Sequence, residues 1–252
     1  MKEAYGLLKG KVALVTGAGK GIGKAIAECF AKEGAVVYAN SRTEGSIDKW
    51  AEELSREYNA NVIPIYFDIT DRVGTKNSII KIKKKYEKLD ILINNAGITS
   101  NQLLNSITRD TLEKLFEVNV FAVIELMQLA SKLMIRNKSG SIINISSIVG
   151  QKGNKGQLAY SATKGAIIAL TKSAAKELAD YNIRVNSIAP GLTNTDVVKD
   201  VEKKKLEERI SNIALGRLGT PDDISNACLF LASDLASYIS GEIIGVNGCA
   251  KM

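Results

Sequence analysis

The chain contains no histidine among its 252 residues. Histidine is the usual general base of enzymes, the central member of serine triads and the commonest metal ligand. Its absence excludes histidine-based acid-base catalysis, serine triads and histidine-ligated metal sites, and we expect no metal site of any kind. Any proton transfer must therefore depend on another type of side chain.

Cysteine is scarce and scattered. Cys29, Cys228 and Cys249 lie far apart, without the close spacing of a metal cluster or the pattern of a secreted disulfide framework. Residues 1–10 lack the apolar core of a signal peptide, and no later apolar run approaches membrane-spanning length. We therefore expect reduced thiols, no membrane contact and a cytoplasmic protein.

Proline is also rare, with three residues, and we find neither a linker nor a low-complexity stretch. With 45% hydrophobic and 24% charged residues, the composition is that of an ordinary soluble globular protein. The length allows two small domains or one large one. Because no boundary is visible, we predict a single domain over residues 1–252.

The formal net charge of +7 is compatible with an anionic ligand, an acidic partner or, in principle, nucleic acid. Much of the lysine lies in residues 81–88 and 203–205, where Ile82, Tyr86 and Leu206 interleave it. That pattern is typical of the solvated faces of amphipathic helices. No basic motif of the nucleic-acid-binding kind accompanies it, so we expect no nucleic-acid partner.

A strand, a glycine-rich loop and a helix open the chain. Residues 11–16 form a short apolar run, residues 17–23 read Gly-Ala-Gly-Lys-Gly-Ile-Gly, and residues 24–33 have a helical pattern. Glycines let the backbone approach a ligand closely, and a helix N-terminus presents free N–H groups to an anion. This order of elements predicts a phosphate-binding site.

Strands and helices then alternate to the end of the chain. This alternation predicts an α/β protein with a doubly wound parallel sheet, the Rossmann fold, covered by helices on both faces. The further expected strands are residues 35–39, 61–67, 90–93, 141–145, 182–188 and 242–246. The further expected helices are residues 45–58, 75–88, 112–136, 160–180 and 221–233, with an irregular polar region before the last of them.

Ligands of such sheets bind beyond the carboxyl ends of the strands, so the residues that follow each strand are candidates for the site. Polar or glycine residues follow every expected strand, which fits a long ligand with several polar groups. After the glycine loop these residues are Asn40, Ser41 and Arg42; Asp68 and Ile69; Asn94, Asn95, Ala96 and Gly97; Ser146 and Ser147; and Pro190 and Gly191.

Tyr160 and Lys164 are four residues apart, so on a helix their side chains share one face and can meet. A phenol is a poor acid at neutral pH, but a nearby ammonium favours the phenolate and lowers its pKa. We therefore expect Lys164 to lower the pKa of Tyr160, which could then give a proton to a carbonyl oxygen.

Together these motifs resemble the short-chain dehydrogenase/reductase family over residues 11–248. Residues 16–23 are similar to its cofactor fingerprint, and residues 94–97 to its second motif. Asn119, Ser147, Tyr160 and Lys164 fall where the family has its catalytic tetrad. Within the family, residues 119–247 look most like the 3-oxoacyl-acyl-carrier-protein reductases.

The resemblance implies that a ketone is reduced by hydride from a nicotinamide cofactor. Tyr160 would protonate the carbonyl oxygen, Ser147 would hydrogen-bond it, Lys164 would also bind the ribose, and Asn119 would hold a water that relays protons. Residues 190–195 would cap the nicotinamide, and residues 192–219 would form a substrate lid. The implied cofactor contacts are Gly17, Gly19, Lys20, Gly21, Ile22, Gly23, Asn40, Ser41, Arg42, Asp68, Ile69, Asn95, Ala96, Gly97, Tyr160, Lys164, Pro190, Gly191, Thr193, and, for the amide, Ile188 and Thr195.

The residues after the second strand bear on the choice of cofactor. An acidic side chain there binds the adenosine ribose of NAD and repels the phosphate of NADP. We place this position at Asn40, which is neutral, while Arg42 and Lys20 could converge on a phosphate. We therefore expect NADP(H).

The likeliest substrate on this resemblance is a 3-oxoacyl thioester, carried on an acyl carrier protein that basic residues near the entrance would receive. Lys138 could serve, but Tyr181 stands where a second basic residue is expected. Another small ketone, alcohol or ketosugar remains the alternative, and a dinucleotide-binding sensor without turnover is a third reading. The apolar residues of the expected helices 112–136 and 160–180, with the last strand, predict a homotetramer.

Overall fold

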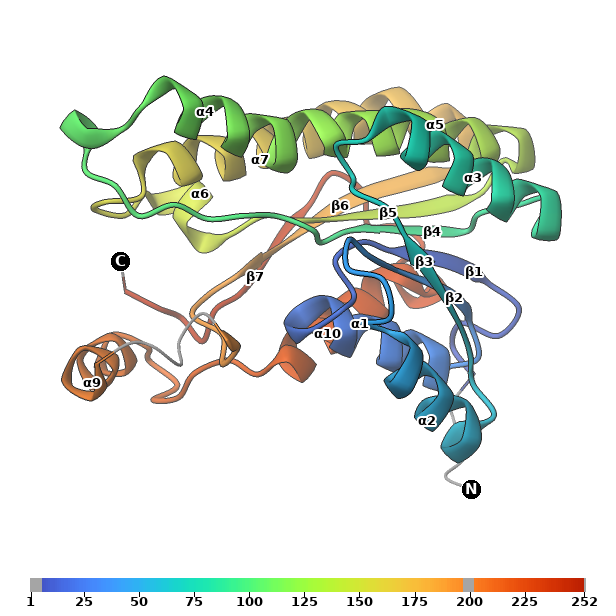
Figure 1. Ribbon diagram of the computed structural model, residues 1–252, viewed down its shortest axis with the longest axis horizontal. Coiled ribbons are helices and arrows are strands. Elements are labelled where there is room, and N and C mark those ends of the chain that lie inside the picture. Colours follow the sequence, from blue (N-terminus) through green and yellow to red (C-terminus); the bar gives the residue numbers. More distant parts are fainter. Residues whose placement is uncertain (1–5, 197–201, 252) are drawn as a thin grey trace.

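The computed structural model describes residues 6–196 and 202–251 (Figure 1). Within them, seven strands form one parallel sheet in the order β3-β2-β1-β4-β5-β6-β7. The strands are β1 Val12–Val15, β2 Val36–Ser41, β3 Asn61–Tyr66, β4 Ile91–Asn94, β5 Gly140–Ile145, β6 Ile183–Pro190 and β7 Ile243–Val246. The predicted single α/β domain with a doubly wound parallel sheet is confirmed.

The strand order reverses at β1, which pairs with β2 on one side and with β4 on the other. Both faces of the central strands are covered, and every residue of β1 and β4 is buried. This explains why these strands are continuous apolar runs rather than alternating ones. The reversal opens a crevice at the carboxyl ends of β1 and β4, where such sheets bind ligands.

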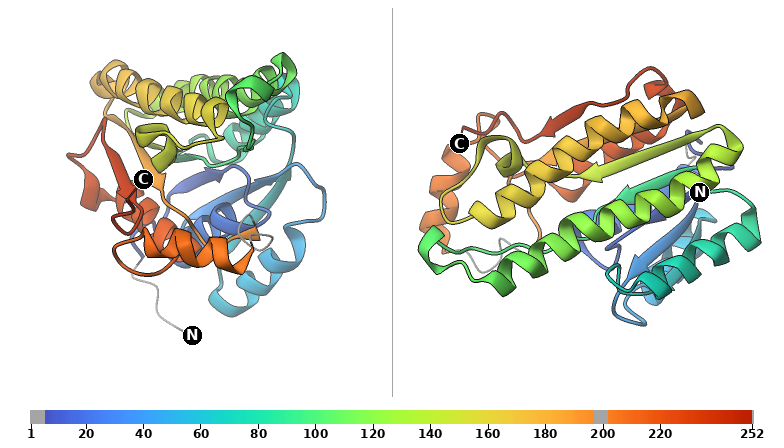
Figure 2. Two further views of the ribbon diagram at one scale, coloured as in Figure 1. Left: turned by 90° about the vertical axis from the view of Figure 1, so that its left-hand side faces the viewer. Right: turned by 90° about the horizontal axis from the view of Figure 1, so that it is seen from above.

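Helices form a layer on each face of the sheet (Figures 1 and 2). One layer holds α1 Gly21–Lys32, α2 Asp48–Tyr58 and α10 Pro221–Ala232; the other holds α3 Arg72–Tyr86, α4 Arg109–Phe116, α5 Ala122–Asn137 and α7 Leu158–Leu178. Two separate apolar clusters fill the spaces between the sheet and these layers. Shorter elements are α6 Ile148–Lys152, α9 Lys203–Ser211, and turns at Leu104–Ser106, Ala179–Tyr181 and Asp234–Ala236.

Three differences from the sequence-based expectation affect the site. The strand expected at residues 35–39 continues to Ser41. The helix expected at residues 112–136 is interrupted by a π-helical turn at Glu117–Phe121. Two helices, α6 and α9, were not predicted, because the first is five residues long and the second lies in a lysine-rich polar stretch.

The expectation that no apolar run reaches membrane-spanning length was wrong for the helical stretch Arg109–Asn137, which is 29 residues long. Its most apolar window has a mean hydropathy of 1.6, and 50% of that window is buried inside the protein. These apolar residues pack against the sheet, as shown by Leu126, Ala130 and Met134 in the cluster beside α3 and α7. The stretch is therefore a core helix of this fold.

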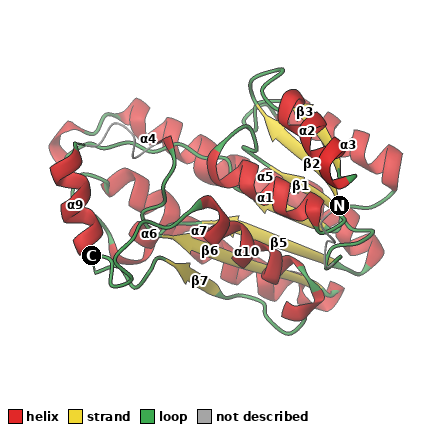
Figure 3. Cartoon of the chain, turned by 90° about the horizontal axis from the view of Figure 1, so that it is seen from below, coloured by secondary structure: helices red, strands yellow, loops and turns green. Residues whose placement is uncertain are grey.

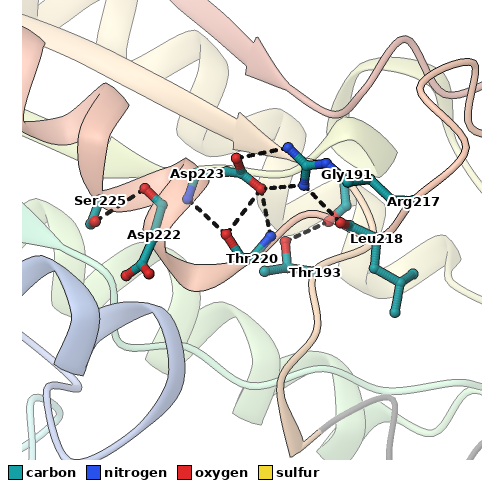
Figure 4. A network of polar contacts seen from close by, with 8 residues as sticks. All are labelled: Gly191, Thr193, Arg217, Leu218, Thr220, Asp222, Asp223 and Ser225. Atoms are coloured by element: carbon teal, nitrogen blue, oxygen red, sulfur yellow. Dashed lines mark hydrogen bonds and ion pairs between the residues drawn. The ribbon is translucent and has the colours of Figure 1, made fainter.

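The connection from β6 to α10 is pinned at its base (Figure 4). Thr193 forms a parallel β-bridge with Gly219, so the two ends of the segment between them lie side by side. Arg217 binds the carboxylate of Asp223 through both terminal nitrogens, at 2.6 and 3.0 Å. Thr220 caps α10 in a reciprocal capping box with Asp223. The predicted lid, residues 192–219, begins and ends here; its residues 197–201 lie outside the described residues.

The capping box has a measurable contribution to stability. The Arg217 guanidinium and the Thr220 hydrogen bonds hold the pKa of the Asp223 carboxyl well below its usual range, so the carboxylate is charged at neutral pH. We expect Thr220→Ala to lower the free energy of unfolding by about 1 kcal/mol, because the Asp223 N–H loses its acceptor. Urea unfolding at a fixed protein concentration measures this. Thr220→Ser keeps the hydroxyl and should match the parent; equal loss in both variants would rule out the cap as the cause.

Candidate active site

Tyr160 and Lys164 lie side by side near the start of α7. The Lys164 ammonium is 5.8 Å from the centre of the Tyr160 ring. Lys164 is 5% exposed, and its Nζ donates to the Ile145 carbonyl at 2.8 Å, at the end of β5. The four-residue spacing thus brings the two side chains together at the carboxyl edge of the sheet.

Burial dominates the ionisation of both groups. It raises the pKa of Tyr160, an effect that the hydrogen bond from Ser147 partly offsets. Burial also lowers the pKa of Lys164 to about 8. The expectation that Lys164 lowers the pKa of Tyr160 was therefore wrong for this structure, because removing both groups from water disfavours both charged forms.

Ser147 follows β5 and caps α6, since its Oγ accepts from the Val149 N–H at 3.4 Å. That bond is long for an N–H donor, so the hydroxyl keeps capacity for other partners. Its hydrogen bond with the Tyr160 phenol puts the two hydroxyls together. A single carbonyl oxygen can therefore meet both.

Asn119 lies on the π-helical turn and is buried. Its Nδ2 donates to the Ile98 carbonyl and the Thr163 hydroxyl, and its Oδ1 accepts from the Ile98 N–H. A Cβ on Gly97 would lie 3.1 Å from Asn119 Oδ1 and 3.6 Å from Lys164 Nζ. Asn119, Gly97 and Lys164 are thus neighbours, and the π turn, common at functional sites, places the amide there.

In the glycine loop, Gly17 and Gly23 have no room for a side chain. A Cβ on Gly23 would lie 2.2 Å from the Gly17 carbonyl oxygen, and one on Gly17 would lie 2.9 Å from the backbone of Ala96. Gly21 has a φ of +57°, and no side chain caps the N-terminus of α1 at Lys20. Gly19 faces Ser41, and Ile22 lines a cavity described below. A bare backbone and an uncapped helix N-terminus fit the diphosphate of a dinucleotide.

Thr16 joins this loop to the end of β4. Its hydroxyl donates to the Ile93 carbonyl and accepts from the N–H groups of Asn95 and Ala96, at 3.0 and 3.1 Å. Asn95 Nδ2 in turn donates to the carbonyls of Thr16 and Gly17. Thr16 is absent from the expected cofactor contacts, although its place directly before the glycines, within the fingerprint of residues 16–23, is a usable signal.

The assignment of Asn40 to the adenosine ribose conflicts with the structure. Asn40 is 2% exposed and lies within β2. Its Nδ2 donates to the Ile65 and Phe67 carbonyls, and its Oδ1 accepts from the Gly17 N–H. Because β2 continues one residue further, Ser41 is the half-buried residue at the strand end.

Two cations, each beside a carboxylate, lie at this edge. The Arg42 side chain is 80% exposed, and its Nη1 lies 3.8 Å from Asp68 Oδ2. Lys20 pairs with Asp196 at 3.0 Å. A hydrogen bond from the Thr70 backbone lowers the pKa of Asp68, and the charge of Arg42 lowers it by a smaller amount. Ile69 is buried in the core, so only its backbone faces this edge.

Residues 190–195 pass over the carboxyl ends of β5 and β6. Pro190, Gly191, Thr193 and Thr195 line the same cavity as Tyr160, and a Cβ on Gly21 would lie 3.6 Å from Thr195. Ile188 does not belong with them. It is fully buried inside β6, and its carbonyl accepts from the N–H and hydroxyl of Ser146. Ile188 therefore offers no group to a nicotinamide amide.

Two cavities meet at Ser147 and Tyr160. The smaller, about 290 Å³, lies between the glycine loop, β4 and residues 190–195. The larger, about 950 Å³, extends towards α6, α9 and the end of the chain. The predicted site residues that line the smaller one are Ile22, Asn95, Gly97, Ser147, Tyr160, Lys164, Pro190, Gly191, Thr193 and Thr195. This arrangement suits a cofactor ring on one side of the two hydroxyls and a substrate on the other.

Lys138 and Tyr181 are not near this entrance within one chain. Lys138 ends α5, and its carbonyl accepts from Asn182 Nδ2 just before β6 begins. This is the amino edge of the sheet, opposite the tetrad. Within one chain, Lys138 therefore does not lie where it could receive a carrier protein at this entrance, and neither does Tyr181.

Comparisons with known proteins agree with this geometry. A family model described as enoyl-(acyl carrier protein) reductase matches residues 17–249. The chain is 42% identical to the 3-oxoacyl-[acyl-carrier-protein] reductase FabG of Thermotoga maritima, over 96% of this chain and 98% of the relative. It is 40% identical to a 3alpha-hydroxysteroid dehydrogenase of Mediterraneibacter gnavus, over 97% and 98%.

A solved structure has the same fold. The 3-oxoacyl-[acyl-carrier protein] reductase of Brucella melitensis superimposes with a TM-score of 0.93 at 29% identity, covering 99% of this chain and 94% of that one. The match of a family model to most of the chain, and of relatives along nearly its whole length, confirms the resemblance seen in the motifs. The chain therefore belongs to the short-chain dehydrogenase/reductase family of oxidoreductases, which use a nicotinamide dinucleotide.

Proposed function

We propose that this enzyme uses NADPH to reduce the ketone of a 3-oxoacyl thioester to a secondary alcohol. The observation that carries the proposal is the pair of hydroxyls, Ser147 and Tyr160, in the wall that two cavities share. The names of several relatives support the acyl thioester as substrate. We also propose that the enzyme works in the cytoplasm, consistent with its three free cysteines.

In the mechanism, a bound nicotinamide dinucleotide supplies the hydride that reaches the carbonyl carbon. The N-terminus of α1 would hold the diphosphate of that cofactor, and Lys164 would donate to its ribose hydroxyls. Ser147 holds the carbonyl oxygen and stabilises its developing negative charge. Tyr160, whose raised pKa keeps it protonated, gives its proton to that oxygen. Hydride on carbon and a proton on oxygen complete the alcohol.

Proton replacement runs through Lys164 and Asn119. The Asn119 amide already uses both of its N–H groups and one Oδ1 lone pair, on Ile98 and Thr163. One Oδ1 lone pair is left for a water molecule next to Lys164. Asn119 therefore acts chiefly as a positioning residue that holds the loop after β4 against α7.

We expect Tyr160→Phe to lower kcat by about a thousandfold with NADPH affinity nearly unchanged, because only the proton donor is lost. Kinetic assays with a 3-oxoacyl thioester measure kcat, and fluorescence titration with NADPH measures the affinity for the cofactor. Tyr181→Phe, at an exposed tyrosine on the opposite edge, is the matched control. Activity within tenfold of the parent in Tyr160→Phe would refute the role of the phenol.

Cofactor choice rests on the end of β2. We propose that Arg42 and Lys20 bind the 2′-phosphate of NADPH, since both are 80% exposed and their carboxylate partners lie at the surface. Ser41 replaces Asn40 as the position that discriminates, because it is the last residue of the strand and half exposed. A neutral serine there does not repel a phosphate.

We expect Arg42→Ala to weaken NADPH binding about tenfold and to leave NADH unaffected, because one charged hydrogen bond is lost. Ser41→Asp should move the preference towards NADH. Lys49→Ala, at an exposed cation on α2, is the control. Titration with both cofactors measures these changes. Equal affinity of the parent protein for NADPH and NADH would overturn the assignment.

We expect Asn40→Asp to behave differently from Ser41→Asp. A carboxylate at Asn40 would face the carbonyls of Ile65 and Phe67 without a donor of its own, so the protein should lose stability instead of changing cofactor. Thermal unfolding of the two variants separates these outcomes.

We propose that the chain assembles into a homotetramer. Ile124 on α5, Leu158 on α7 and Phe121 on the π turn are large apolar side chains between 38% and 49% exposed. Among the described strands, β7 also lies at an edge of the sheet, next to Leu235 and Tyr238, both exposed. Apolar helix faces and an open strand edge both favour burial against another copy.

Light scattering should give the mass of four chains at micromolar concentration. We expect Ile124→Asp to dissociate the assembly, because it would bury a charge at the contact. Val73→Asp, at an exposed apolar residue on α3, should not change the mass. A stable monomer in the parent protein would contradict this proposal.

A further inference from the structure

The larger cavity is lined by four positively charged side chains from separate segments. They are Lys152 at the end of α6, Lys155 in the loop before α7, Arg209 on α9 and Lys251 near the end of the chain. Among the described residues that line this cavity there is no aspartate or glutamate. None of the four cations forms an ion pair with another described residue, although several other surface cations do.

The structure keeps these segments together at one end of the molecule, where α9 lies beside the C-terminus (Figures 1 and 3). Lys152 Nζ donates to the Ala250 carbonyl at 3.0 Å, and the Lys251 N–H donates to the Asn212 carbonyl at 2.8 Å. Ile213 pairs with Ala250 in an antiparallel bridge. The Lys152 ammonium is therefore held in place, and the backbone of Lys251 is fixed next to it.

The polarity of the cavity lining also changes from its inner end to its solvent side. Ser147 and Tyr160 lie at its junction with the smaller cavity, and Ile148, Val149, Leu192 and Ile213 add apolar surface. The four cationic residues are exposed, so they lie on the solvent side. A ligand of matching shape has a reactive carbonyl at one end, an apolar middle and an anion at the other.

We propose that these four cations form a subsite for a phosphate group at the end of the thioester substrate remote from its carbonyl. The proposal rests on the thioester reduction proposed above and adds that the phosphorylated pantetheine arm, not the acyl group alone, is recognised. Such an arm occurs both on a carrier protein and in coenzyme A. The carrier protein presents this group as a phosphodiester and coenzyme A presents it as a diphosphate, so both place an anion at the same distance from the thioester.

The test compares one 3-oxoacyl group on pantetheine, on 4′-phosphopantetheine, on coenzyme A and on a carrier protein. We expect the phosphopantetheine thioester to have a KM about tenfold below that of the pantetheine thioester at similar kcat, because the phosphate adds binding at a distance from the reacting atoms. The preference should shrink as salt rises, since exposed charges are screened. Coenzyme A and the carrier protein should share it.

The double variant Lys155→Gln/Arg209→Gln should remove the preference while leaving the pantetheine thioester unchanged. It spares Lys152 and Lys251, which hold the chain terminus, and unchanged turnover of pantetheine thioester shows that it is folded. Lys81→Gln/Lys84→Gln on α3 removes the same charge far from the cavity and should keep the preference.

The two proposals fail in different ways. Equal KM values for the pantetheine and phosphopantetheine thioesters would overturn the phosphate subsite and leave the reduction intact. A preference that survives the double variant or is insensitive to salt would also overturn it. Failure to reduce any of the four thioesters would refute the proposed function itself.

Discussion

The burial of one ammonium group, that of Lys164, organises the carboxyl edge of this sheet. A lysine that is 5% exposed has few ways to avoid the cost of lost hydration, and here it has the Ile145 carbonyl at 2.8 Å and the Tyr160 ring beside it. Its side chain fixes the relation of α7 to the end of β5. On the other side, a Cβ on Gly97 would lie 3.6 Å from the ammonium and only 3.1 Å from Asn119 Oδ1, so the tight contact there is with Asn119. The lowered pKa of Lys164 follows from this burial, and the raised pKa of Tyr160 follows from the burial of its own phenol.

A second constraint joins the cofactor cradle to the same edge. The Thr16 hydroxyl and the Asn95 amide link the glycine loop to the loop after β4 through a closed set of hydrogen bonds. Because β1 and β4 are neighbours at the point where the strand order reverses, the cradle and the tetrad form a single rigid corner. In the larger cavity, backbone contacts join the segment after α9 to residues 250–251, and Thr193 pairs with Gly219 at the base of the connection.

Much of this was predictable from the sequence, because apolar runs and glycine loops report burial and backbone shape directly. The sheet, its parallel direction and most strand ends follow from the alternation of elements. The failures have physical reasons. Asn40 looks like a loop residue, but its amide is used to bond three backbone groups inside the fold. Ile188 was expected at the end of its strand, but β6 continues to Pro190, and the sequence alone does not fix where this strand ends. The π turn at Asn119 and the pKa values depend on packing, which no local pattern encodes.

The position of Ala250 and Lys251 in the wall of the larger cavity has a practical consequence for handling the protein. Both residues line that cavity, and the Ala250 carbonyl accepts from Lys152. A bulky label attached to Lys251 would therefore lie at the substrate entrance and compete with these contacts. Leu7 and Leu8, by contrast, bond to Glu33 after α1, and neither residue lines the cavity. A label attached to the exposed Lys9 beside them leaves the entrance clear.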